Sequence, residues 1–283
     1  MAGGRLAVIG LGLIGGSLAW AARQSGAYSG VIGYDLAPGV AEGALEMGVI
    51  DAVAASAAEA AGRADLVVVA TPPLAVLATI LEAAAACRPG TVVTDVAGFK
   101  AGLEKAVPEQ LPAGVAYVGG HPMAGSERSG LAAADSSLFV GAVYAVTGPA
   151  GRPATEAVLS LARSVGACPV LMDAATHDRA AAVVSHLPYL LAVGLCLTAE
   201  AFGPEAAGLA AGAFRDATRV AAGPPEVGRG MCAGNATEVA RAWTELKAVV
   251  DGLMAALAAT GDPFHRARSF RDRLSFPVTQ KEG

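Results

Sequence analysis

Short, near-continuous apolar runs recur along the first part of the chain, separated by stretches with helical spacing. The apolar runs are rich in β-branched residues, as in strands buried on both faces. They lie at 5–10, 31–35, 66–70, 91–95, 116–119 and 143–147, with a last short run at 170–172. Helix-forming residues fill the stretches at 16–25, 39–47 and 74–86. This alternation predicts an α/β fold with a doubly wound, mostly parallel sheet.

The pattern changes after about Asp173, where strand signals become rare and the sequence becomes rich in Ala and Leu. Helical spacing runs through 176–187, 189–202, 205–214, 236–260 and 263–273. Pro188 falls between the first two stretches, where its ring and its missing N–H are expected to kink or break the helix. We therefore expect a sheet domain over 1–173 and an all-helical domain over 174–283.

Composition narrows the classes of protein to which the chain can belong. Of the 283 residues, 54% are hydrophobic and 16% are charged, which favours a sizeable core and argues against disorder. The net charge is -5, and blocks of like charge are absent. Nucleic acid is therefore not expected as the main partner, and an anionic substrate would need a local cationic pocket.

Neither the cysteines nor the apolar runs indicate secretion or a membrane. The four cysteines form no C-x-x-C pair, so buried reduced thiols are expected rather than a zinc or redox site. The apolar stretch 6–18 contains four glycines and fits a nucleotide-binding element better than a signal peptide. The run at 187–199 has about 13 residues, too few to span a bilayer. We expect a soluble, cytoplasmic protein.

The first predicted strand runs straight into a glycine loop, and a helix is expected to follow. Gly10 permits the tight turn, Gly12 lets a pyrophosphate approach the backbone, and Gly15 lets the helix pack against the strand. The helix N-terminus, with Leu13 and Ile14, then presents free N–H groups to the diphosphate. The spacing predicts a dinucleotide-binding site.

Two further features support this site. Asp35 ends the second strand about 20 residues beyond the last glycine, where its carboxylate can accept hydrogen bonds from ribose hydroxyls. The same carboxylate repels a 2′-phosphate, which favours NAD over NADP. Thr71 and Pro72 follow the third apolar run and are expected to line the adenine or nicotinamide side of the crevice.

His121 is the candidate catalytic base. It follows a strand predicted to end at the same sheet edge, in a loop between Gly120 and Pro122. A neutral imidazole near polar partners can accept a proton around pH 7. Ser126 and Glu127 follow at a second bend and add a hydroxyl and a carboxylate. A cofactor that takes hydride and a base that takes a proton together indicate a dehydrogenase.

The segment at 119–130, GGHPMAGSERSG, closely resembles the signature of the prephenate dehydrogenases, enzymes of tyrosine biosynthesis. Further similar motifs follow over nearly the whole chain: TDV at 94–96 with Lys100, SHLP at 185–188 and FRDATR at 214–219. The related arogenate dehydrogenases share most of them. The resemblance implies a Rossmann-type domain followed by a helical dimerisation domain, and a homodimer.

The resemblance also implies the reaction. Its substrate is a cyclohexadienol that carries a ring carboxylate and a pyruvyl side chain. NAD accepts hydride from the carbinol carbon, His121 takes the hydroxyl proton, and the ring carboxylate leaves as carbon dioxide. The implied product of prephenate is 4-hydroxyphenylpyruvate.

Roles for other residues are carried over in the same way. Arg219 is expected to grip a substrate carboxylate, with the planar fork that suits this task. Glu127 is expected at the pocket mouth, where it pairs with Arg219 or gates entry. The remaining assignments place substrate contacts at Ser126, Ser185, His186 and a partner-subunit Gly212, and a cofactor contact at Asp95.

Three positions depart from the family pattern. Gly98 stands where the family usually has a serine that orients the histidine, Tyr189 where many members have a second histidine, and Gly228 where many have a tryptophan. These changes leave the choice between prephenate and arogenate open, including the use of both. Two other hypotheses are a β-hydroxyacid dehydrogenase or imine reductase, and a non-enzymatic NAD-binding protein.

Overall fold

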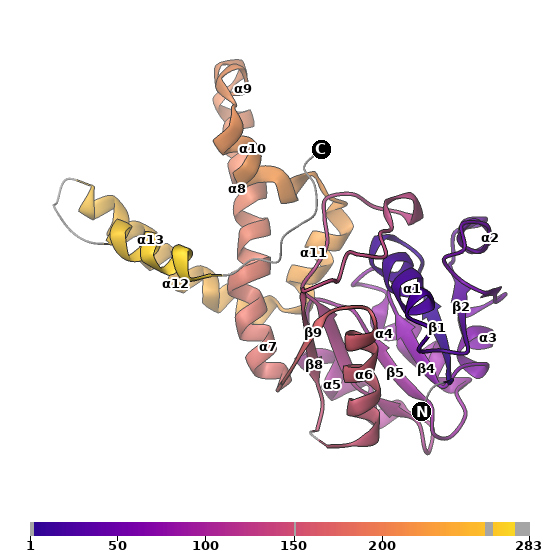
Figure 1. Ribbon diagram of the computed structural model, residues 1–283. Helices are drawn as coiled ribbons and strands as arrows, with labels where there is room; N and C mark the ends of the chain where they lie inside the picture. The colour runs from indigo at the N-terminus through magenta and orange to yellow at the C-terminus, as the bar shows by residue number, and fades with distance from the viewer. Residues whose placement is uncertain (1–2, 150, 258–262, 275–283) are drawn as a thin grey trace.

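The computed structural model describes residues 3–149, 151–257 and 263–274, in which a sheet-containing part precedes a helical part (Figure 1). The last strand, β9 (Cys168–Met172), ends the sheet-containing part. Helix α7 (Ala174–Ala181) follows at once, and the Asp173 side chain caps its N-terminus by accepting a hydrogen bond from the Thr176 amide. The segments described beyond this point carry helices and their connections.

Six parallel strands form the main sheet, in the order β3-β2-β1-β4-β5-β6. They are β1 (Arg5–Ile9), β2 (Gly30–Tyr34), β3 (Ala52–Val53), β4 (Leu66–Val69), β5 (Val92–Asp95) and β6 (Ala116–Tyr117). Every neighbouring pair is parallel. The chain starts at the centre and winds outward on both sides, so the order reverses between β1 and β4, where such sheets bind ligands. The doubly wound sheet is confirmed; β3 was missed because two residues carry no periodicity.

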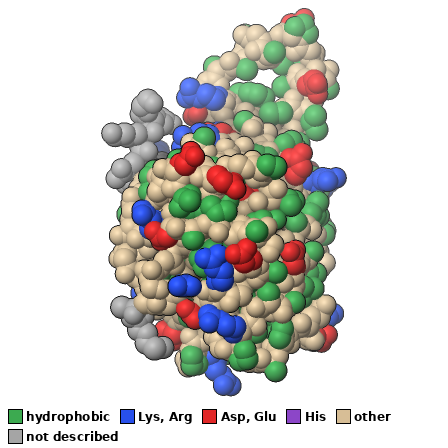
Figure 2. All heavy atoms as spheres, turned by 90° about the vertical axis from the view of Figure 1, so that its right-hand side faces the viewer, with side chains coloured by type: hydrophobic (Ala, Val, Ile, Leu, Met, Phe, Trp, Pro, Cys, Tyr) green, Lys and Arg blue, Asp and Glu red, His purple; other side chains and the backbone are tan. Residues whose placement is uncertain are grey.

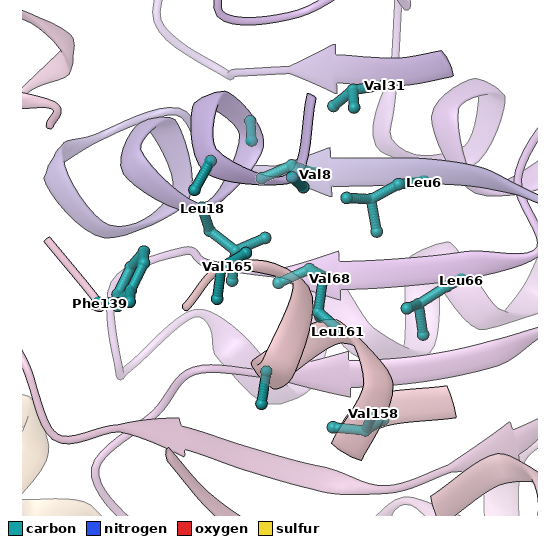
Figure 3. Packing of buried hydrophobic residues seen from close by; sticks show 14 of the residues in the cluster. Leu6, Val8, Leu18, Val31, Leu66, Val68, Phe139, Val158, Leu161 and Val165 are labelled. Atoms are coloured by element: carbon teal, nitrogen blue, oxygen red, sulfur yellow. The ribbon is translucent and has the colours of Figure 1, made fainter. Parts of the chain in front are cut away.

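Helices cover both faces of this sheet, which explains the continuous apolar runs. Leu6 and Val8 of β1 belong to the core on one face, together with residues of helices α1 (Leu13–Ser25) and α6 (Pro153–Ser164) (Figure 3). Ala7 and Ile9 point to the opposite core. That second core includes residues of α3 (Ala57–Gly62), α4 (Val76–Ala85) and α5 (Ala101–Ala106). Helix α2 (Val40–Glu46) adds Ala41 and Ala44 to the first core.

A second sheet of three strands differs from the prediction. Strand β7 (Gly119–Pro122) pairs antiparallel with β8 (Val143–Thr147), and β8 pairs parallel with β9. The predicted placement of 143–147 in the parallel sheet and of His121 in a loop was therefore wrong. His121 lies within β7, opposite Ala145. Gly and Pro are depleted in strands, so GGHP carries little strand signal.

Two glycines allow β7 to pass close to the end of β5. A Cβ on Gly120 would lie 2.7 Å from the carbonyl oxygen of Asp95 and 3.0 Å from the Tyr144 ring. A Cβ on Gly119 would overlap the hydroxyl of Thr147 and lie 2.8 Å from Cδ of Lys100. The approach to the end of β5 therefore requires Gly120, and Gly119 leaves room for the Thr147 and Lys100 side chains beside it. Together they bring the backbone before His121 against the carboxyl edge of the main sheet.

One uninterrupted helical segment of 29 residues opens the helical part, at Ala174–Phe202. It consists of α7, a π-helical turn at Ala182–His186 and α8 (Leu187–Phe202). The expected break at Pro188 is absent, because the π turn directly before it shifts the hydrogen-bond register where proline lacks a donor. The apolar run at 187–199 is thus part of a longer helix.

By length and composition alone this segment passes a test for membrane-spanning helices, with a mean hydropathy of 1.9. Helices in the core of soluble proteins pass the same test but are mostly buried, whereas 28% of the apolar window is buried here. It stands upright in Figure 1 and projects beyond the sheet-containing part. Exposed apolar side chains near its end include Leu197 and Phe202. The arm that projects at the top of Figure 2 carries many hydrophobic side chains.

Five further α-helices and a 3-10 turn at Arg219–Ala222 complete the described chain. The α-helices are α9 (Pro204–Leu209), α10 (Gly212–Thr218), α11 (Pro225–Gly234), α12 (Ala236–Ala256) and α13 (Pro263–Arg273). The helix expected at 205–214 is two helices, since Ala210 has extended backbone angles. Helix α11 was not predicted, because its three glycines argue against a helix. The expected helix at 236–260 ends at Ala256, and residues 258–260 lie outside the described residues.

We expect Gly120→Ala to destabilise the protein by about 1–3 kcal/mol, because the added methyl overpacks the contact between β7 and the end of β5. Urea unfolding at one protein concentration measures this change. Gly102→Ala in helix α5 is the matched control, since no heavy atom lies within 4 Å of its added Cβ. The control should be neutral or more stable. Equal effects of the two substitutions would refute the close-approach explanation.

Candidate active site

The glycine loop between β1 and α1 has the geometry of a phosphate-binding turn. Gly10 has a positive φ of 93°, and a Cβ there would lie 2.6 Å from the carbonyl oxygen of Ala70. A Cβ on Gly15 would overlap the carbonyl oxygen of Gly10. By contrast, a Cβ on Gly12 would meet no heavy atom within 4 Å. The loop therefore packs tightly against the protein at Gly10 and Gly15, whereas Gly12 leaves room for a ligand to approach the backbone.

This open side lies at the N-terminus of α1, whose first turn begins with Leu13 and Ile14 and has no side-chain cap. Such a terminus presents backbone N–H groups and a positive dipole end to an anion. Asp35 directly follows the neighbouring strand β2. Its carboxylate accepts hydrogen bonds from the amides of Leu11 (2.7 Å) and Ala37 (2.9 Å). These contacts hold the carboxylate next to the loop, as a ribose-binding group requires.

Thr71 and Pro72 directly follow β4 at the same carboxyl edge. Thr71 is half-buried, and its hydroxyl lies 3.5 Å from that of Thr79 in α4. The strand ends of β1, β2 and β4 thus bring together the glycine loop, Asp35 and this Thr-Pro pair. The open cradle at Gly12 fits a dinucleotide diphosphate.

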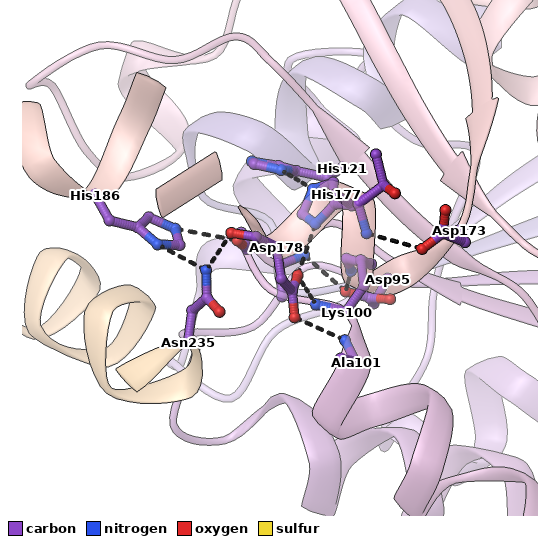
Figure 4. A network of polar contacts seen from close by, with 12 residues as sticks. Asp95, Lys100, Ala101, His121, Asp173, His177, Asp178, His186 and Asn235 are labelled. Carbon is purple, nitrogen blue, oxygen red and sulfur yellow. Dashed lines mark hydrogen bonds and ion pairs between the residues drawn. The ribbon is translucent and has the colours of Figure 1, made fainter. Parts of the chain in front are cut away.

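A chain of three hydrogen-bonded side chains leads inward from His121 (Figure 4). The Nδ1 atom of His121 lies 2.8 Å from Nε2 of His177, and Nδ1 of His177 lies 2.8 Å from a carboxylate oxygen of Asp178. His177 and Asp178 come from α7 and are almost fully buried, whereas His121 is partly buried. The chain therefore joins the second sheet to the helical part.

The contacts determine the tautomers of the two histidines. Asp178, as a carboxylate, only accepts hydrogen bonds, so Nδ1 of His177 carries the proton and donates it. When His177 is neutral, its Nε2 then has a lone pair and accepts from Nδ1–H of His121. The Nε2 atom of His121 is left unprotonated. The hydrogen bonds to His177 and Asp178 thus leave Nε2 of His121 as the basic nitrogen, on the side of the ring that does not face His177.

Asp178 is anchored by the backbone at the start of helix α5. Its two carboxylate oxygens accept hydrogen bonds from the amides of Lys100 (2.8 Å) and Ala101 (2.9 Å). Burial raises the pKa of Asp178, but the hydrogen bonds from His177 and these amides outweigh it and hold the pKa below its usual value. The group therefore stays ionised and orients His177.

Below this relay lies a buried ion pair between Lys100 and Asp95, both of which are 0% exposed. Asp95 also accepts hydrogen bonds from the Tyr117 hydroxyl (2.7 Å) and the Ala97 amide (2.7 Å). Asp95 was expected at the cofactor. Unlike the partly exposed Asp35, its carboxylate is completely buried and paired with Lys100, so we infer that it holds the loop after β5 in place.

Burial lowers the pKa of His121 well below 6.5, and the neighbouring His177, Lys100 and His186 lower it further. The ring is therefore neutral at pH 7. A neutral ring with a free Nε2 is the protonation state that a general base needs.

His186 is completely buried, with partners on both ring nitrogens. Its Nε2–H donates to the carbonyl of Gly98 (3.1 Å), and its Nδ1 accepts from Asn235 (3.2 Å). Asn235 also donates to the carbonyl of Asp178 (2.7 Å). With no ring nitrogen free for a substrate, we place His186 among the residues that hold the site together.

The absence of a serine hydroxyl at Gly98 is partly explained by its neighbour. A Cβ on Gly98 would lie 2.9 Å from Cγ of Met231 in α11, so the Met231 side chain occupies the space beside this position. Ser185 is half-buried, and its hydroxyl lies 3.6 Å from the Met231 sulfur. Ser185 and Gly98 thus both contact Met231, and Ser185 directly precedes His186 in the chain.

Gly228 and Tyr189 depart from the family pattern together. A Cβ on Gly228 would overlap the ring of Tyr189, so the ring lies directly on the backbone of α11. Gly228 is buried, and Tyr189 is half-buried. The tyrosine therefore fills space that a side chain at 228 would otherwise take.

The loop after β7 carries the carboxylate that pairs with Arg219. Arg219 donates a hydrogen bond of 2.8 Å to Glu127, and the two side chains are 56% and 35% exposed. A hydrogen bond from its own backbone amide and the Arg219 guanidinium lower the pKa of Glu127. The hydroxyl of Ser126 accepts a hydrogen bond from the Arg128 amide (3.2 Å), and Gly212 begins α10 with an exposed surface.

Sequence reasoning missed His177, Asp178 and Asn235. Apart from the bond between His177 and Asp178 themselves, their partners lie 49 to 78 residues away along the chain, and no short motif links them. The only local signal is an adjacent His-Asp pair one turn into a helix that Asp173 caps. That pair carries no chemistry until the helix docks against β7 and α5.

Comparison with known proteins gives one family over both parts of the chain. The family model described as the nucleotide-binding domain of prephenate dehydrogenase matches residues 18–171, and its dimerization domain matches residues 173–267. The prephenate dehydrogenase of Bacillus subtilis (strain 168) is 33% identical over 283 residues, covering 96% of this chain and 76% of that protein.

Two solved structures are similar over almost the whole chain. Arogenate dehydrogenase from Synechocystis has 30% identity and a TM-score of 0.76, covering 95% of this chain and 99% of that chain. Prephenate dehydrogenase from A. aeolicus, in complex with hydroxyphenyl propionate and NAD+, has 25% identity and a TM-score of 0.83, covering 95% and 96%.

The lowered pKa of His121 predicts a loss of stability in mild acid. Its folded pKa lies below the unfolded value near 6.5, so below that pH the unfolded chain binds a proton that the folded chain does not. The free energy of unfolding should fall by up to about 1.4 kcal/mol per pH unit for this group as pH drops from 6.5. Urea unfolding between pH 7 and 5 measures the slope.

His121→Asn should flatten this slope, because its amide can still donate to His177 but takes up no proton. His265→Asn, at an exposed histidine in α13, is the control and should keep the parent's slope. Burial also lowers the pKa of His186, so this histidine adds to the pH dependence of the unfolding free energy. Its contribution should remain in both variants. If the parent and His121→Asn gave the same slope, the buried neutral state of His121 would be disproved.

Proposed function

The chain belongs to the prephenate dehydrogenase family, and we propose that it catalyses the NAD-dependent oxidative decarboxylation of prephenate to 4-hydroxyphenylpyruvate. The observation that carries this proposal is the free, neutral Nε2 of His121, held by the relay to Asp178. Its strand passes the carboxyl edge of the sheet that carries the glycine loop. An enzyme that oxidises an alcohol carbon needs a proton acceptor beside the nucleotide.

Bound NAD supplies the hydride acceptor for the reaction. The diphosphate is assigned to Gly12 and the first turn of α1, including Leu13, Ile14 and Gly15. Asp35 is assigned to the ribose hydroxyls, and its charge disfavours the 2′-phosphate of NADP. Thr71 and Pro72 line the crevice beside them. The NAD+ named with the A. aeolicus enzyme supports this choice of cofactor.

His121 acts as the general base for the substrate hydroxyl. Its Nε2 accepts the hydroxyl proton as the carbinol carbon loses hydride, and a positioned base contributes about 10²–10⁴-fold to such a step. The ring carboxylate leaves as carbon dioxide, and the ring becomes aromatic. The protein therefore has to orient the carbon, remove one proton and bind two carboxylates.

Arg219 is the proposed ligand for a substrate carboxylate. Its guanidinium already binds one carboxylate, that of Glu127, and more than half of its side chain is exposed. Substrate can therefore reach the guanidinium by exchanging with Glu127. Ser126 stands next to Glu127 in the same loop, and Ser185 is assigned to the substrate from its place beside Met231.

The substrate side chain distinguishes prephenate from arogenate, which carries an amino acid in place of the keto acid. The similarity to an arogenate dehydrogenase keeps arogenate, or use of both substrates, as the alternative. Tyr189 and Gly228 are assigned to the border of this end of the substrate. Because Tyr189 takes the space above Gly228, the border has a phenol where many relatives have an imidazole and an indole.

We also propose a cytoplasmic homodimer, with nucleotide bound by residues 1–173 and dimerisation through 174–283. The matched dimerization domain and the exposed apolar residues of α8 support this, among them Leu191, Leu195 and Leu197. A second copy placed on this surface would bury them. Gly212, exposed at the start of α10, is then assigned to the partner's site.

The test of the proposed reaction is the formation of NADH when NAD is mixed with prephenate or arogenate. We expect turnover with at least one of them, and His121→Asn should bind NAD normally but lose about 10²–10⁴-fold in kcat. Absorbance at the NADH band and NAD titration measure the two quantities. Binding of NAD without turnover of either substrate would instead support the non-enzymatic hypothesis.

Arg219→Ala should raise the KM for prephenate by about tenfold or more, because a substrate carboxylate loses a charged partner, while the KM for NAD stays unchanged. Arg63→Ala, which removes another exposed arginine paired with a glutamate, is the control and should change neither constant. An unchanged KM for prephenate in Arg219→Ala would move the carboxylate site elsewhere.

A further inference from the structure

We propose that His177 is a proton-relay and positioning residue, which receives the proton that His121 takes from the substrate. This inference rests on the proposed function, in which His121 is the base. Nδ1 of His121 and Nε2 of His177 lie 2.8 Å apart, and their rings are inclined at 70° with centroids 5.1 Å apart. The distance suits direct proton transfer between the two nitrogens.

The transfer balances without another reactant. The bond between the substrate oxygen and its proton breaks, and a bond from that proton to Nε2 of His121 forms. The Nδ1–H bond of His121 then breaks while the Nε2–H bond of His177 forms. His121 ends neutral, with its proton on Nε2, and His177 ends as an imidazolium paired with the Asp178 carboxylate. Loss of hydride and of carbon dioxide leaves a phenolate oxygen on the ring. The return of the proton along the same path gives the phenol and restores the resting tautomers of both histidines.

The surrounding charges favour the positive charge on the inner ring. Asp178 hydrogen-bonds Nδ1 of His177 directly, at 2.8 Å, whereas His121 has no carboxylate partner among the contacts of the described residues. Lys100 and His186 face His121, and like His177 they disfavour a positive charge on its ring. Lys100 is in turn neutralised by Asp95, with Glu104 behind it and Tyr117 donating to Asp95. The one carboxylate in contact with either ring is therefore on His177.

A simple positioning role makes a different prediction from a relay. Glutamine at 177 can accept the hydrogen bond from Nδ1–H of His121 through its amide oxygen, but it cannot take up the proton. His177→Gln therefore separates the two roles. His177→Ala removes both and leaves a cavity in an almost fully buried position.

We expect His177→Gln to keep the KM values for NAD and prephenate and to lower the rate of NADH formation in single-turnover experiments by about 10²-fold. His265→Gln makes the same exchange at an exposed histidine and should leave the rate unchanged. A parent-like rate in His177→Gln would overturn the relay, since glutamine preserves only the positioning contact. A raised KM together with the lost rate would also overturn it, because misplacement of His121 would then explain both.

Nitrogen-15 NMR of the histidine rings tests the relay without turnover. At neutral pH the parent should show Nδ1–H on both His121 and His177, and His121 should keep this tautomer in His177→Gln. As the pair takes up one proton, His121 should change to the Nε2–H tautomer while His177 becomes the imidazolium. An imidazolium on His121 with His177 neutral would overturn the proposal.

The two measurements keep the relay and the proposed function apart. If the parent turned over neither prephenate nor arogenate, the proposed function would fail. The NMR measurement of the two ring tautomers would still show whether the proton goes to His177 or stays on His121. If the parent turned over prephenate and the rings titrated in the opposite order, the function would stand and the relay would fall.

Discussion

The carboxylate of Asp178 is the contact on which the site depends. It comes from the first helix of the helical part and accepts two backbone hydrogen bonds at the start of α5, from Lys100 and Ala101. An acid at a helix N-terminus interacts favourably with the helix dipole. The same group accepts a hydrogen bond from His177. One side chain therefore fixes the docking of two parts of the chain and the tautomer of the imidazole behind His121.

The remainder of the site follows from how closely β7 approaches the main sheet. Gly120 lets its backbone lie against the end of β5, and the ladder with β8 fixes the direction of His121. The cradle at Gly12 lies on the same sheet edge but belongs to another strand end. The candidate site is thus divided between rigid strands, while the helices supply the inner hydrogen-bond partners.

Features that depend on local spacing could be predicted from the sequence. The glycine loop, Asp35 and the parallel strands were recognisable because neighbouring residues carry the signal, and His121 stood out in its glycine-flanked segment. The strand that contains His121 was not recognised, because glycine and proline hide it. The continuation of the long helix through Pro188 depends on a π turn, for which the hydrophobic pattern gives no sign.

Contacts between distant segments could not be predicted. His177 meets His121 only after α7 docks, and the buried role of Asp95 depends on Lys100 folding back over it. Asp95 illustrates the difference. The family resemblance implied a cofactor contact for it, whereas in the folded chain its carboxylate is completely buried and accepts hydrogen bonds from Ala97 and Tyr117.

Helix α11 packs against its neighbours through bare backbone, and this limits how the seam between the two parts can evolve. Across this seam a Cβ on Gly230 would lie 3.0 Å from Pro73, and one on Gly234 would overlap the ring of Phe99. Within the helical part, Gly228 lies under the Tyr189 ring in the same way. Where a ring rests on a main chain there is no rotamer to adjust. A bulkier residue in α11 therefore has to arise together with a smaller one opposite, so substitutions across this seam should accumulate as coupled pairs in descendants of this sequence.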